Sequence, residues 1–269
     1  MLLTIIKGCA VQIEFVTEGD GPPALFLPGS YSTPSAWRQV WAHLPAGIQR
    51  NAIALPGYGR TEEVRPWGAA HINQMIDLVA EAADRLDGPV HLVGHSFGGL
   101  NALATALSGR VDLASLALFE GNPINILRSI GQTALWDDAR ATSDRFAAAV
   151  EAGEPDAPAI IIDYWGGDGA FASFPAPVQD YCRATARTNV LDWDCAWTFA
   201  PDLAAAAALD VPVLLVRGAQ SNPAIAMIYD RLAQAMTGGG QHPIAGAGHF
   251  MIATHPKESA ALLAGFWGL

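Results

Sequence analysis

A Gly-x-Ser-x-Gly pattern spans residues 94–98, with Ser96 at its centre. It follows the apolar run Val90–Val93 directly and leads into small residues typical of a helix. Such a turn between a strand and a helix pushes the serine out of the sheet and exposes its hydroxyl at the helix N-terminus. Glycines flank it because a Cβ there would collide with neighbouring backbone. We therefore predict that Ser96 is a catalytic nucleophile.

A serine hydroxyl is a weak nucleophile unless a base removes its proton, and histidine, with a pKa near neutrality, is the usual base. His249 follows a short apolar run and a glycine-rich turn late in the chain, a setting that predicts a loop beside Ser96. His95, although adjacent to Ser96, is predicted to be a packing residue. No histidine pair has the spacing of metal ligands, so we expect no metal site. The remaining histidines, predicted to be structural or solvated, are His43, His71, His91, His242 and His255.

A carboxylate usually orients such a histidine and stabilises its cation. Glu120 ends the apolar run Leu113–Phe119, whereas Ser221 and Asn222 follow the later run Val211–Val216 with no carboxylate near. A glutamate at the end of a buried strand needs a partner, because a buried charge is costly. We predict that Glu120 is the third member. If Glu120 were instead a salt-bridged edge residue, Asn222 or an aspartate of the segment 122–205 would orient the histidine.

An oxyanion that forms during acyl transfer needs preorganised N–H donors. Phe97, which directly follows the nucleophile at a helix start, is predicted to supply one backbone N–H. The second is predicted at Ser30, in the Pro28–Tyr31 turn that follows the apolar run Ala24–Leu27.

Continuous apolar runs alternate with helical patterns through most of the chain, which indicates a parallel sheet covered on both faces. The runs end at Gly, Pro or polar residues, and ligands bind at the carboxyl ends of strands in such sheets. The predicted strands are Leu2–Ile6, Val11–Thr17 (paired around Gly8), Ala24–Leu27, Asn51–Leu55, Val90–Gly94, Leu113–Phe119 and Val211–Val216. The predicted helices are Ser35–Leu44, Ile72–Leu86, Phe97–Leu107, Ala224–Ala235 and Pro256–Trp267.

The alternation stops in the segment 122–205, which is too long for a loop and holds four of the eight tryptophans. We predict a helical cap, or lid, over the strand ends, with residues 1–121 and 206–269 as the core. Its tryptophans either bind substrate or form the core of the cap. The residues predicted to bind substrate are Tyr31, Trp136, Trp165, Trp193 and Phe250.

The composition bounds the function further. A formal net charge of −11, most of it in the segment 122–205, argues against nucleic acid as a partner. No apolar run is long enough to span a membrane, and the N-terminus does not have the pattern of a signal peptide. The odd number of cysteines (Cys9, Cys182 and Cys195) favours reduced thiols and a cytoplasmic location. We expect a small-molecule substrate and no cofactor.

With these residues placed, the chain resembles the α/β-hydrolase fold superfamily, in particular its capped serine esterases and lactonases. The resemblance covers nearly the whole chain and rests on the Gly-His-Ser-Phe-Gly-Gly turn, the Gly-Ala-Gly-His loop and the order nucleophile, acid, histidine. It implies an α/β fold with a mostly parallel eight-stranded sheet, helices on both faces and a helical cap after the sixth strand. The superfamily usually places its acid after the seventh strand; a subset places it after the sixth, as Glu120 would be here.

The residues and the resemblance together predict a serine hydrolase that cleaves a small, neutral, fairly apolar ester or lactone through an acyl-enzyme. Negative charge near the site would disfavour anionic substrates. Two alternatives stay open on the same fold. One is a lyase, a carbon–carbon bond hydrolase or a perhydrolase, and the other is a ligand-binding receptor without catalysis.

Overall fold

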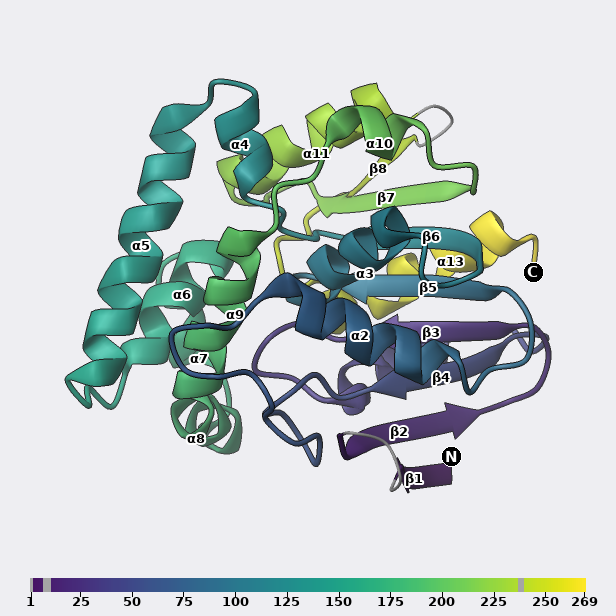
Figure 1. Ribbon diagram of the computed structural model, residues 1–269, viewed down its shortest axis with the longest axis horizontal. Coiled ribbons are helices and arrows are strands. Elements are labelled where there is room, and N and C mark those ends of the chain that lie inside the picture. The colour runs from purple at the N-terminus through teal and green to yellow at the C-terminus, as the bar shows by residue number, and fades with distance from the viewer. Residues whose placement is uncertain (1, 7–10, 237–239) are drawn as a thin grey trace.

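The computed structural model describes residues 2–6, 11–236 and 240–269, among which eight strands form one central sheet (Figure 1). The strand order is β1-β2-β4-β3-β5-β6-β7-β8; neighbours from β4 onward are parallel, while β2 pairs antiparallel with both β1 and β4. The predicted α/β class with a mostly parallel sheet is thereby confirmed. The strands are β1 Leu2–Ile6, β2 Ile13–Glu18, β3 Pro23–Leu27, β4 Gln49–Ile53, β5 Val90–His95, β6 Leu113–Phe119, β7 Val213–Gly218 and β8 Gln241–Ile244.

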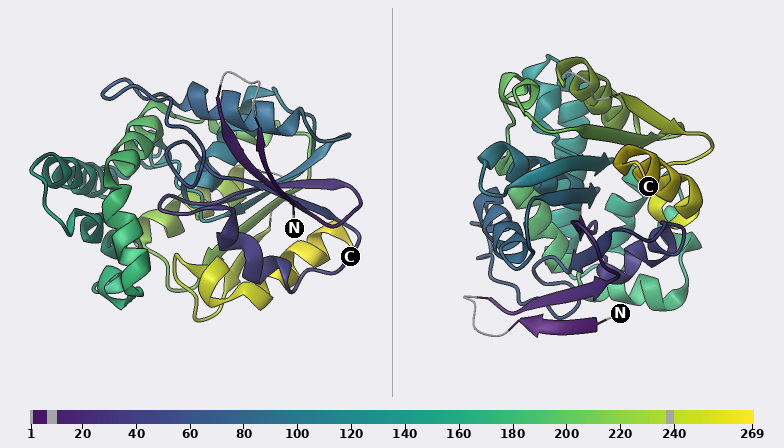
Figure 2. Two further views of the ribbon diagram at one scale, coloured as in Figure 1. Left: turned by 90° about the horizontal axis from the view of Figure 1, so that it is seen from below. Right: turned by 90° about the vertical axis from the view of Figure 1, so that its right-hand side faces the viewer.

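The sheet separates two apolar clusters, one on each face. Along β3 the side chains alternate between them: Leu25 and Leu27 belong to one cluster, and Ala24 and Phe26 to the other, as the two-residue period of a strand requires. Helices α2, α3 and α11 pack on the first face, whereas η1, α1, α12 and α13 pack on the second (Figure 2). These helices are η1 Pro34–Trp37, α1 Arg38–Trp41, α2 Ile72–Ala83, α3 Phe97–Ser108, α11 Pro223–Ala235, α12 Met251–Thr254 and α13 Pro256–Trp267.

The chain between β6 and β7 is helical, and its larger helices lie beyond the carboxyl ends of the strands (Figure 1). Its buried residues, among them Phe146, Ile161 and Trp165, continue the apolar cluster that contains α2 and α3. The division into a core and a cap at residues 122 and 205 stays a prediction. The helices are α4 Asn125–Ser129, α5 Thr133–Glu151, α6 Ala157–Gly166, α7 Ala170–Ser173, α8 Ala176–Ala184, α9 Ala186–Thr198 and α10 Leu203–Ala207.

Most predicted strands and helices keep their expected bounds to within a few residues, and β1 keeps them unchanged. Strand β2 begins at Ile13 rather than Val11, and the predicted turn at Gly8 and the thiol of Cys9 lie outside the described residues. The predicted helix Ser35–Leu44 is split into η1 and α1 and ends at Trp41.

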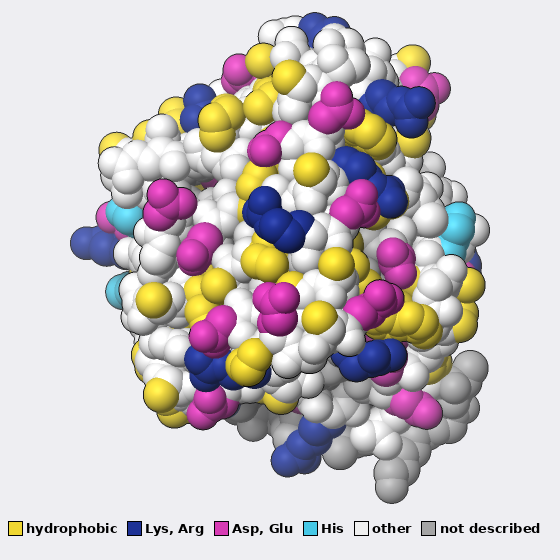
Figure 3. Space-filling model, turned by 90° about the vertical axis from the view of Figure 1, so that its left-hand side faces the viewer, with side chains coloured by type: hydrophobic (Ala, Val, Ile, Leu, Met, Phe, Trp, Pro, Cys, Tyr) yellow, Lys and Arg dark blue, Asp and Glu magenta, His cyan; other side chains and the backbone are white. Residues whose placement is uncertain are grey.

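The outer face of α5, α6 and α8 shows acidic side chains interspersed with arginines (Figure 3). Arg183, for example, pairs with both Asp156 and Asp180. The other two cysteines, Cys182 and Cys195, are buried free thiols. In the part of the chain that the structure describes, each helix is too short or too polar to cross a membrane.

The turn from β5 into α3 places Ser96 at the sheet edge in a conformation that side chains rarely adopt, with φ 54° and ψ −124°. A Cβ on Gly94 would collide with the backbone of Gly98 and Gly99, and one on Gly98 would collide with the carbonyl oxygens of Leu27 and Pro28. The steric need for both glycines is therefore confirmed, because backbone and not flexible side chains occupies the space.

We expect Gly98→Ala to lower the free energy of unfolding by about 1–3 kcal/mol, since the added methyl meets backbone that must shift. The matched control is Gly265→Ala in α13, where a Cβ has open space. That change should raise stability by about 0.5–1 kcal/mol, as alanine does in a helix. Urea unfolding of the three proteins measures both effects; equal stabilities of Gly98→Ala and the parent would contradict the steric account.

Candidate active site

Three side chains from separate loops form one hydrogen-bonded chain at the carboxyl edge of the sheet. The Oγ of Ser96 lies 2.9 Å from Nε2 of His249, and Nδ1 of His249 lies 2.7 Å from Oε2 of Glu120. All three residues are buried. The structure thus brings together the three residues predicted from the sequence, in the geometry of a nucleophile, a base and an orienting acid.

The Glu120 carboxylate is fully buried, yet each of its oxygens has donors. Oε2 faces His249, while Oε1 accepts hydrogen bonds from the Gly218 backbone N–H at 2.6 Å and from the Ser221 hydroxyl. Burial by itself raises the pKa of Glu120, but hydrogen bonds from His249, Ser221 and Gly218 outweigh it and leave that pKa below its usual value. The carboxylate is therefore ionised and able to stabilise a histidine cation.

The alternative orienting residue Asn222 makes the hydrogen bonds of its side chain elsewhere. Asn222 caps α11: its Oδ1 accepts from the Ala224 N–H at 2.8 Å, and its Nδ2 donates to the Tyr164 carbonyl at 2.7 Å. Ser221, next to it, contacts Glu120 instead. The loop after β7 therefore supports the carboxylate from β6 rather than supplying one of its own.

His95 has a more specific place than the packing role predicted for it. Its Nε2 lies 2.8 Å from the backbone carbonyl of His249, so the ring next to the nucleophile holds the loop that carries the base. Burial, together with the neighbouring charge of His249, lowers the pKa of His95 to about 4. The ring is therefore neutral near pH 7, with its Nε2–H donating to that carbonyl.

Three non-glycine residues in the described chain have a positive φ, and all three lie at this edge of the sheet. They are Tyr31 (57°), Ser96 (54°) and Glu120 (47°), located after β3, β5 and β6 respectively. Such conformations cost of order 1–3 kcal/mol each and persist only where the surroundings enforce them. Their clustering marks the edge as a site whose side chains are held in imposed directions.

The two predicted oxyanion donors border the nucleophile. Phe97 is the first residue of α3, so no helix carbonyl can accept its N–H. Ser30 and Phe97 both line a cavity with Ser96, and the Ser30 hydroxyl donates to Oδ2 of Asp192 at 2.6 Å. This bond fixes the loop after β3, while the role of the two N–H groups stays a prediction.

Two cavities meet at Ser96 and His249. The first, which we call the α9 chamber, has a volume of about 50 Å³ and is bordered by Trp165, Trp193, Asn122, Asn189 and Asp192. The second, which we call the apolar cavity, has a volume of about 330 Å³, and its lining includes Phe174, Pro175, Val178, Ile252 and Ala253. The site therefore offers separate space to the two sides of a bond held at Ser96.

Four of the five predicted substrate-binding residues line these cavities. Tyr31 and Phe250 border both, whereas Trp165 and Trp193 border the α9 chamber. The ring of Trp165 stacks on that of His249, with centroids 5.5 Å apart and planes 26° apart. This contact covers one face of the base.

Trp136, the fifth residue predicted to bind substrate, has its side chain engaged elsewhere, and its role in binding substrate stays a prediction. Its indole N–H donates to Oδ1 of Asn125 at 2.9 Å, its ring packs against Trp197, and the guanidinium of Arg128 lies over it. Trp136 borders neither the α9 chamber nor the apolar cavity. It ties α5 to α4 and α9 and belongs to the core of the helical segment.

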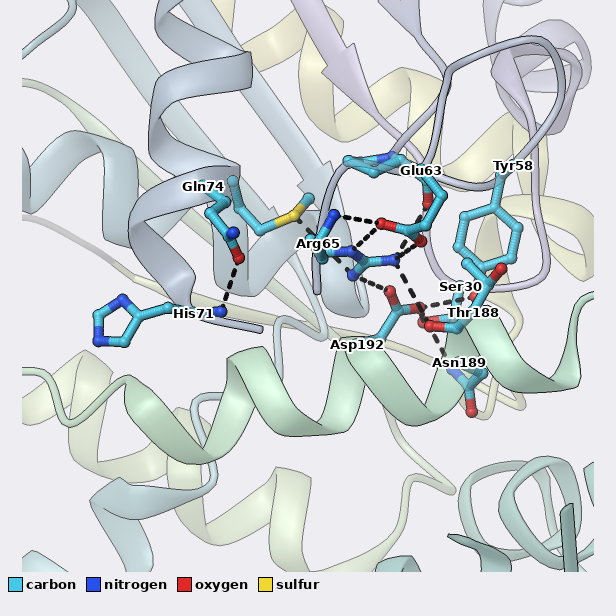
Figure 4. A network of polar contacts seen from close by, with 11 residues as sticks. Ser30, Tyr58, Glu63, Arg65, His71, Gln74, Thr188, Asn189 and Asp192 are labelled. Atoms are coloured by element: carbon cyan, nitrogen blue, oxygen red, sulfur yellow. Dashed lines mark hydrogen bonds and ion pairs between the residues drawn. The ribbon is translucent and has the colours of Figure 1, made fainter. Parts of the chain in front are cut away.

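A buried ion pair connects α9 to the loop after β4 (Figure 4). Nη1 of Arg65 lies 2.6 Å from Oδ1 of Asp192, and Arg65 also contacts both carboxylate oxygens of Glu63. Oδ2 of Asp192 accepts from the hydroxyls of Ser30 and Tyr58. Burial alone would lower the pKa of Arg65, but Asp192 and Glu63 raise it, so the guanidinium stays charged.

Sequence reasoning does not identify this network. Arg65 and Asp192 lie 127 positions apart, and neither belongs to a motif. Asp192 is one of many acidic residues in its segment, and only its burial, at 2% exposure, distinguishes it.

Comparison with known proteins agrees with this geometry. A family model described as "Alpha/beta hydrolase family" matches residues 24–262. A pimeloyl-[acyl-carrier protein] methyl ester esterase of Nitrosomonas europaea is 28% identical over 118 residues, 44% of each chain. A 2-hydroxy-6-oxononadienedioate/2-hydroxy-6-oxononatrienedioate hydrolase of Burkholderia vietnamiensis is 31% identical over 121 residues, 42% of this chain and 41% of that one. The matches thus span less than half the length of these two curated relatives.

Among solved structures, Est816, described as an N-acyl homoserine lactone degrading enzyme, superimposes with a TM-score of 0.76. The superposition covers 98% of this chain and 100% of that one, at 17% sequence identity. At this identity the likeness shows the fold alone.

The low pKa of His95 gives the protein a defined pH dependence. Between pH 6.5 and 4 the unfolded chain binds a proton at this ring and the folded protein does not, so stability decreases as the pH falls through this window. We expect about 2 kcal/mol of the loss between pH 7 and pH 5 to come from His95.

His95→Gln, which keeps an N–H donor, should remove that part of the pH dependence, whereas His43→Gln on the exposed surface should keep it. Urea unfolding at pH 7, 6 and 5 measures the difference. Identical pH slopes for His95→Gln and the parent would show that His95 is not a buried neutral ring.

Proposed function

The chain belongs to the alpha/beta hydrolase family, and we propose that it is a serine hydrolase that cleaves a small, neutral, largely apolar ester or lactone. The observation that carries the proposal is the chain of two hydrogen bonds from Ser96 Oγ through His249 to the buried carboxylate of Glu120. Esterases and lipases are among the relatives that match parts of the chain.

In the proposed reaction, Ser96 Oγ attacks the ester carbonyl while Nε2 of His249 takes its proton. The Glu120 carboxylate stabilises the resulting imidazolium through Nδ1. The N–H groups of Phe97 and Ser30 stabilise the oxyanion. His249 then protonates the leaving alcohol, and a water activated by the same base releases the acid from the acyl-enzyme.

The charge around the site supports a neutral substrate. None of the described residues that line the α9 chamber or the apolar cavity is a lysine or arginine, and Asp192 borders the chamber. A substrate carboxylate would therefore find no lysine or arginine in either lining to pair with. The substrate of the Burkholderia relative is, by its name, a dioate, which fits this site less well than an uncharged ester does.

We extend the proposal to the helical segment. Residues 122–205 act as a cap, because Trp165 and Trp193 border the α9 chamber from α6 and α9. Phe174, just after α7, and Val178, in α8, border the apolar cavity. The 2.7 Å contact between His249 and Glu120 supports catalysis over a receptor role, since ligand binding alone needs no oriented base.

We expect Ser96→Ala to lower kcat for p-nitrophenyl butyrate by at least about 10⁴-fold, because the variant keeps the pocket but has no nucleophile. The exposed Ser173→Ala change in α7 is the matched control and should leave the rate as it is. Turnover of p-nitrophenyl butyrate by Ser96→Ala at the parent rate would refute the proposal. Mass spectrometry of the parent after a fluorophosphonate probe should show one adduct, on Ser96.

Glu120→Gln should lower kcat about 10³- to 10⁴-fold, because an amide does not stabilise the imidazolium and does not enforce the required tautomer of His249. Glu81→Gln on the surface of α2 makes the same chemical change away from the site and serves as the control. The readout is kcat for p-nitrophenyl butyrate. A loss of less than tenfold would exclude Glu120 as the orienting acid.

A further inference from the structure

Two buried asparagines in the α9 chamber have side-chain oxygens without a hydrogen-bond partner in the described chain. Asn122, just after β6, is 8% exposed, and Asn189, on α9, is 2% exposed. Both border the chamber beside Ser96. Buried polar atoms in folded proteins are nearly always paired, so two unpaired oxygens in one small cavity call for a partner that occupies it.

The orientation of Asn189 follows from its neighbours. Its Nδ2 lies 3.3 Å from Oδ2 of Asp192, whose other oxygen pairs with Arg65. An ionised carboxylate only accepts hydrogen bonds, so the amide nitrogen must face Asp192 and the amide oxygen is left free. The chamber thus presents an acceptor that the buried ion pair holds in place (Figure 4).

Tyr31 adds a third polar group. It borders both cavities, and its hydroxyl is buried without a partner. Burial raises the pKa of Tyr31 well above its usual value, so the hydroxyl stays protonated and can donate or accept. The larger part of the apolar cavity, by contrast, is lined by apolar residues, among them Phe174, Pro175, Val178, Ile252 and Ala253.

We propose that the α9 chamber is a subsite for a hydrogen-bond donor of the substrate, namely a hydroxyl or amide N–H located a few atoms from the reacting carbonyl. The donor gives its proton to the free oxygen of Asn122 or Asn189, and the apolar remainder of the substrate lies in the apolar cavity. The chamber volume of about 50 Å³ admits roughly three to five water-sized groups, which limits this side to a short polar substituent. The inference rests on the proposed ester hydrolysis at Ser96.

Ordered water is the competing occupant, because one or two waters could pair with the same oxygens. The two occupants differ in what the substrate must carry. If water fills the chamber, a donor on the substrate does not change kcat/KM. If the chamber is a donor subsite, an analogue without the donor leaves an asparagine oxygen unpaired and has a lower kcat/KM.

The test compares esters that differ only in the donor. Hexyl 3-hydroxybutanoate carries the hydroxyl on the acyl side and 2-hydroxyethyl hexanoate on the alcohol side; each is compared with its deoxy and O-methyl analogues. We expect kcat/KM for at least one hydroxylated ester to exceed that of both analogues by about tenfold or more. Calorimetry with Ser96→Ala should give the same order of Kd without turnover.

Variants then assign the preference to the chamber. At least one of the variants Asn122→Leu and Asn189→Leu should reduce the preference for the hydroxylated ester by about tenfold; an unchanged preference in both would overturn the assignment to the chamber. Asn73→Leu on the exposed side of α2 makes the same change outside the site and should retain the full preference. Thermal unfolding checks that each variant is folded. If one is not, the comparison of esters with the parent and with Ser96→Ala still tests whether the substrate needs a donor.

The outcomes separate the two proposals. Ser96-dependent hydrolysis of all esters with equal kcat/KM would overturn the donor subsite, indicate a water-filled chamber and leave the proposed function standing. Absence of Ser96-dependent hydrolysis of any ester would overturn the proposed function. In that case the Kd values of the esters for Ser96→Ala test the donor subsite. Equal affinities for the hydroxylated and deoxy esters would contradict it.

Discussion

The fully buried carboxylate of Glu120 is the constraint around which this edge of the sheet is organised. A charge without access to water must be surrounded by donors, and here they come from the end of β7, from the loop before α11 and from His249. The backbone next to Glu120 is also held by a hydrogen bond: the Tyr229 hydroxyl, from α11, accepts one from the Gly121 N–H at 2.6 Å. His249 is one of the donors that the buried carboxylate requires, so the hydrogen-bonding need of Glu120 sets the position of the base.

The helical segment is attached to the sheet by a second set of buried charges. Removing one partner of a buried ion pair typically costs 3–5 kcal/mol, so the contact between Arg65 and Asp192 specifies where α9 must lie. The same carboxylate holds the Ser30 hydroxyl and the amide of Asn189. One side chain of α9 thereby sets the loop after β3 and one wall of the α9 chamber together.

Much of the fold and part of the site could be predicted from local sequence patterns. Ser96 and His249 lie in glycine-rich turns after apolar runs, and such turns follow from sterics within a few residues. Glu120 required a comparison of two strand ends, since only one of them carries a carboxylate. Trp136 and Trp165 could not be told apart, because composition marks a residue as aromatic but does not say which side of a helix faces the site. Arg65 and Asp192 meet only in the folded chain, so no spacing in the sequence connects them.

The three residues with positive φ imply a conflict between what the backbone prefers and what the chemistry needs. Glycine would relieve the conformation at Tyr31, Ser96 or Glu120, but it would remove a side chain that borders the cavities or forms the hydrogen-bonded chain. Selection for thermal robustness alone would thus favour replacements at these positions that selection for turnover would reject. The edge of this sheet is a place where the protein keeps less stability than its fold could provide.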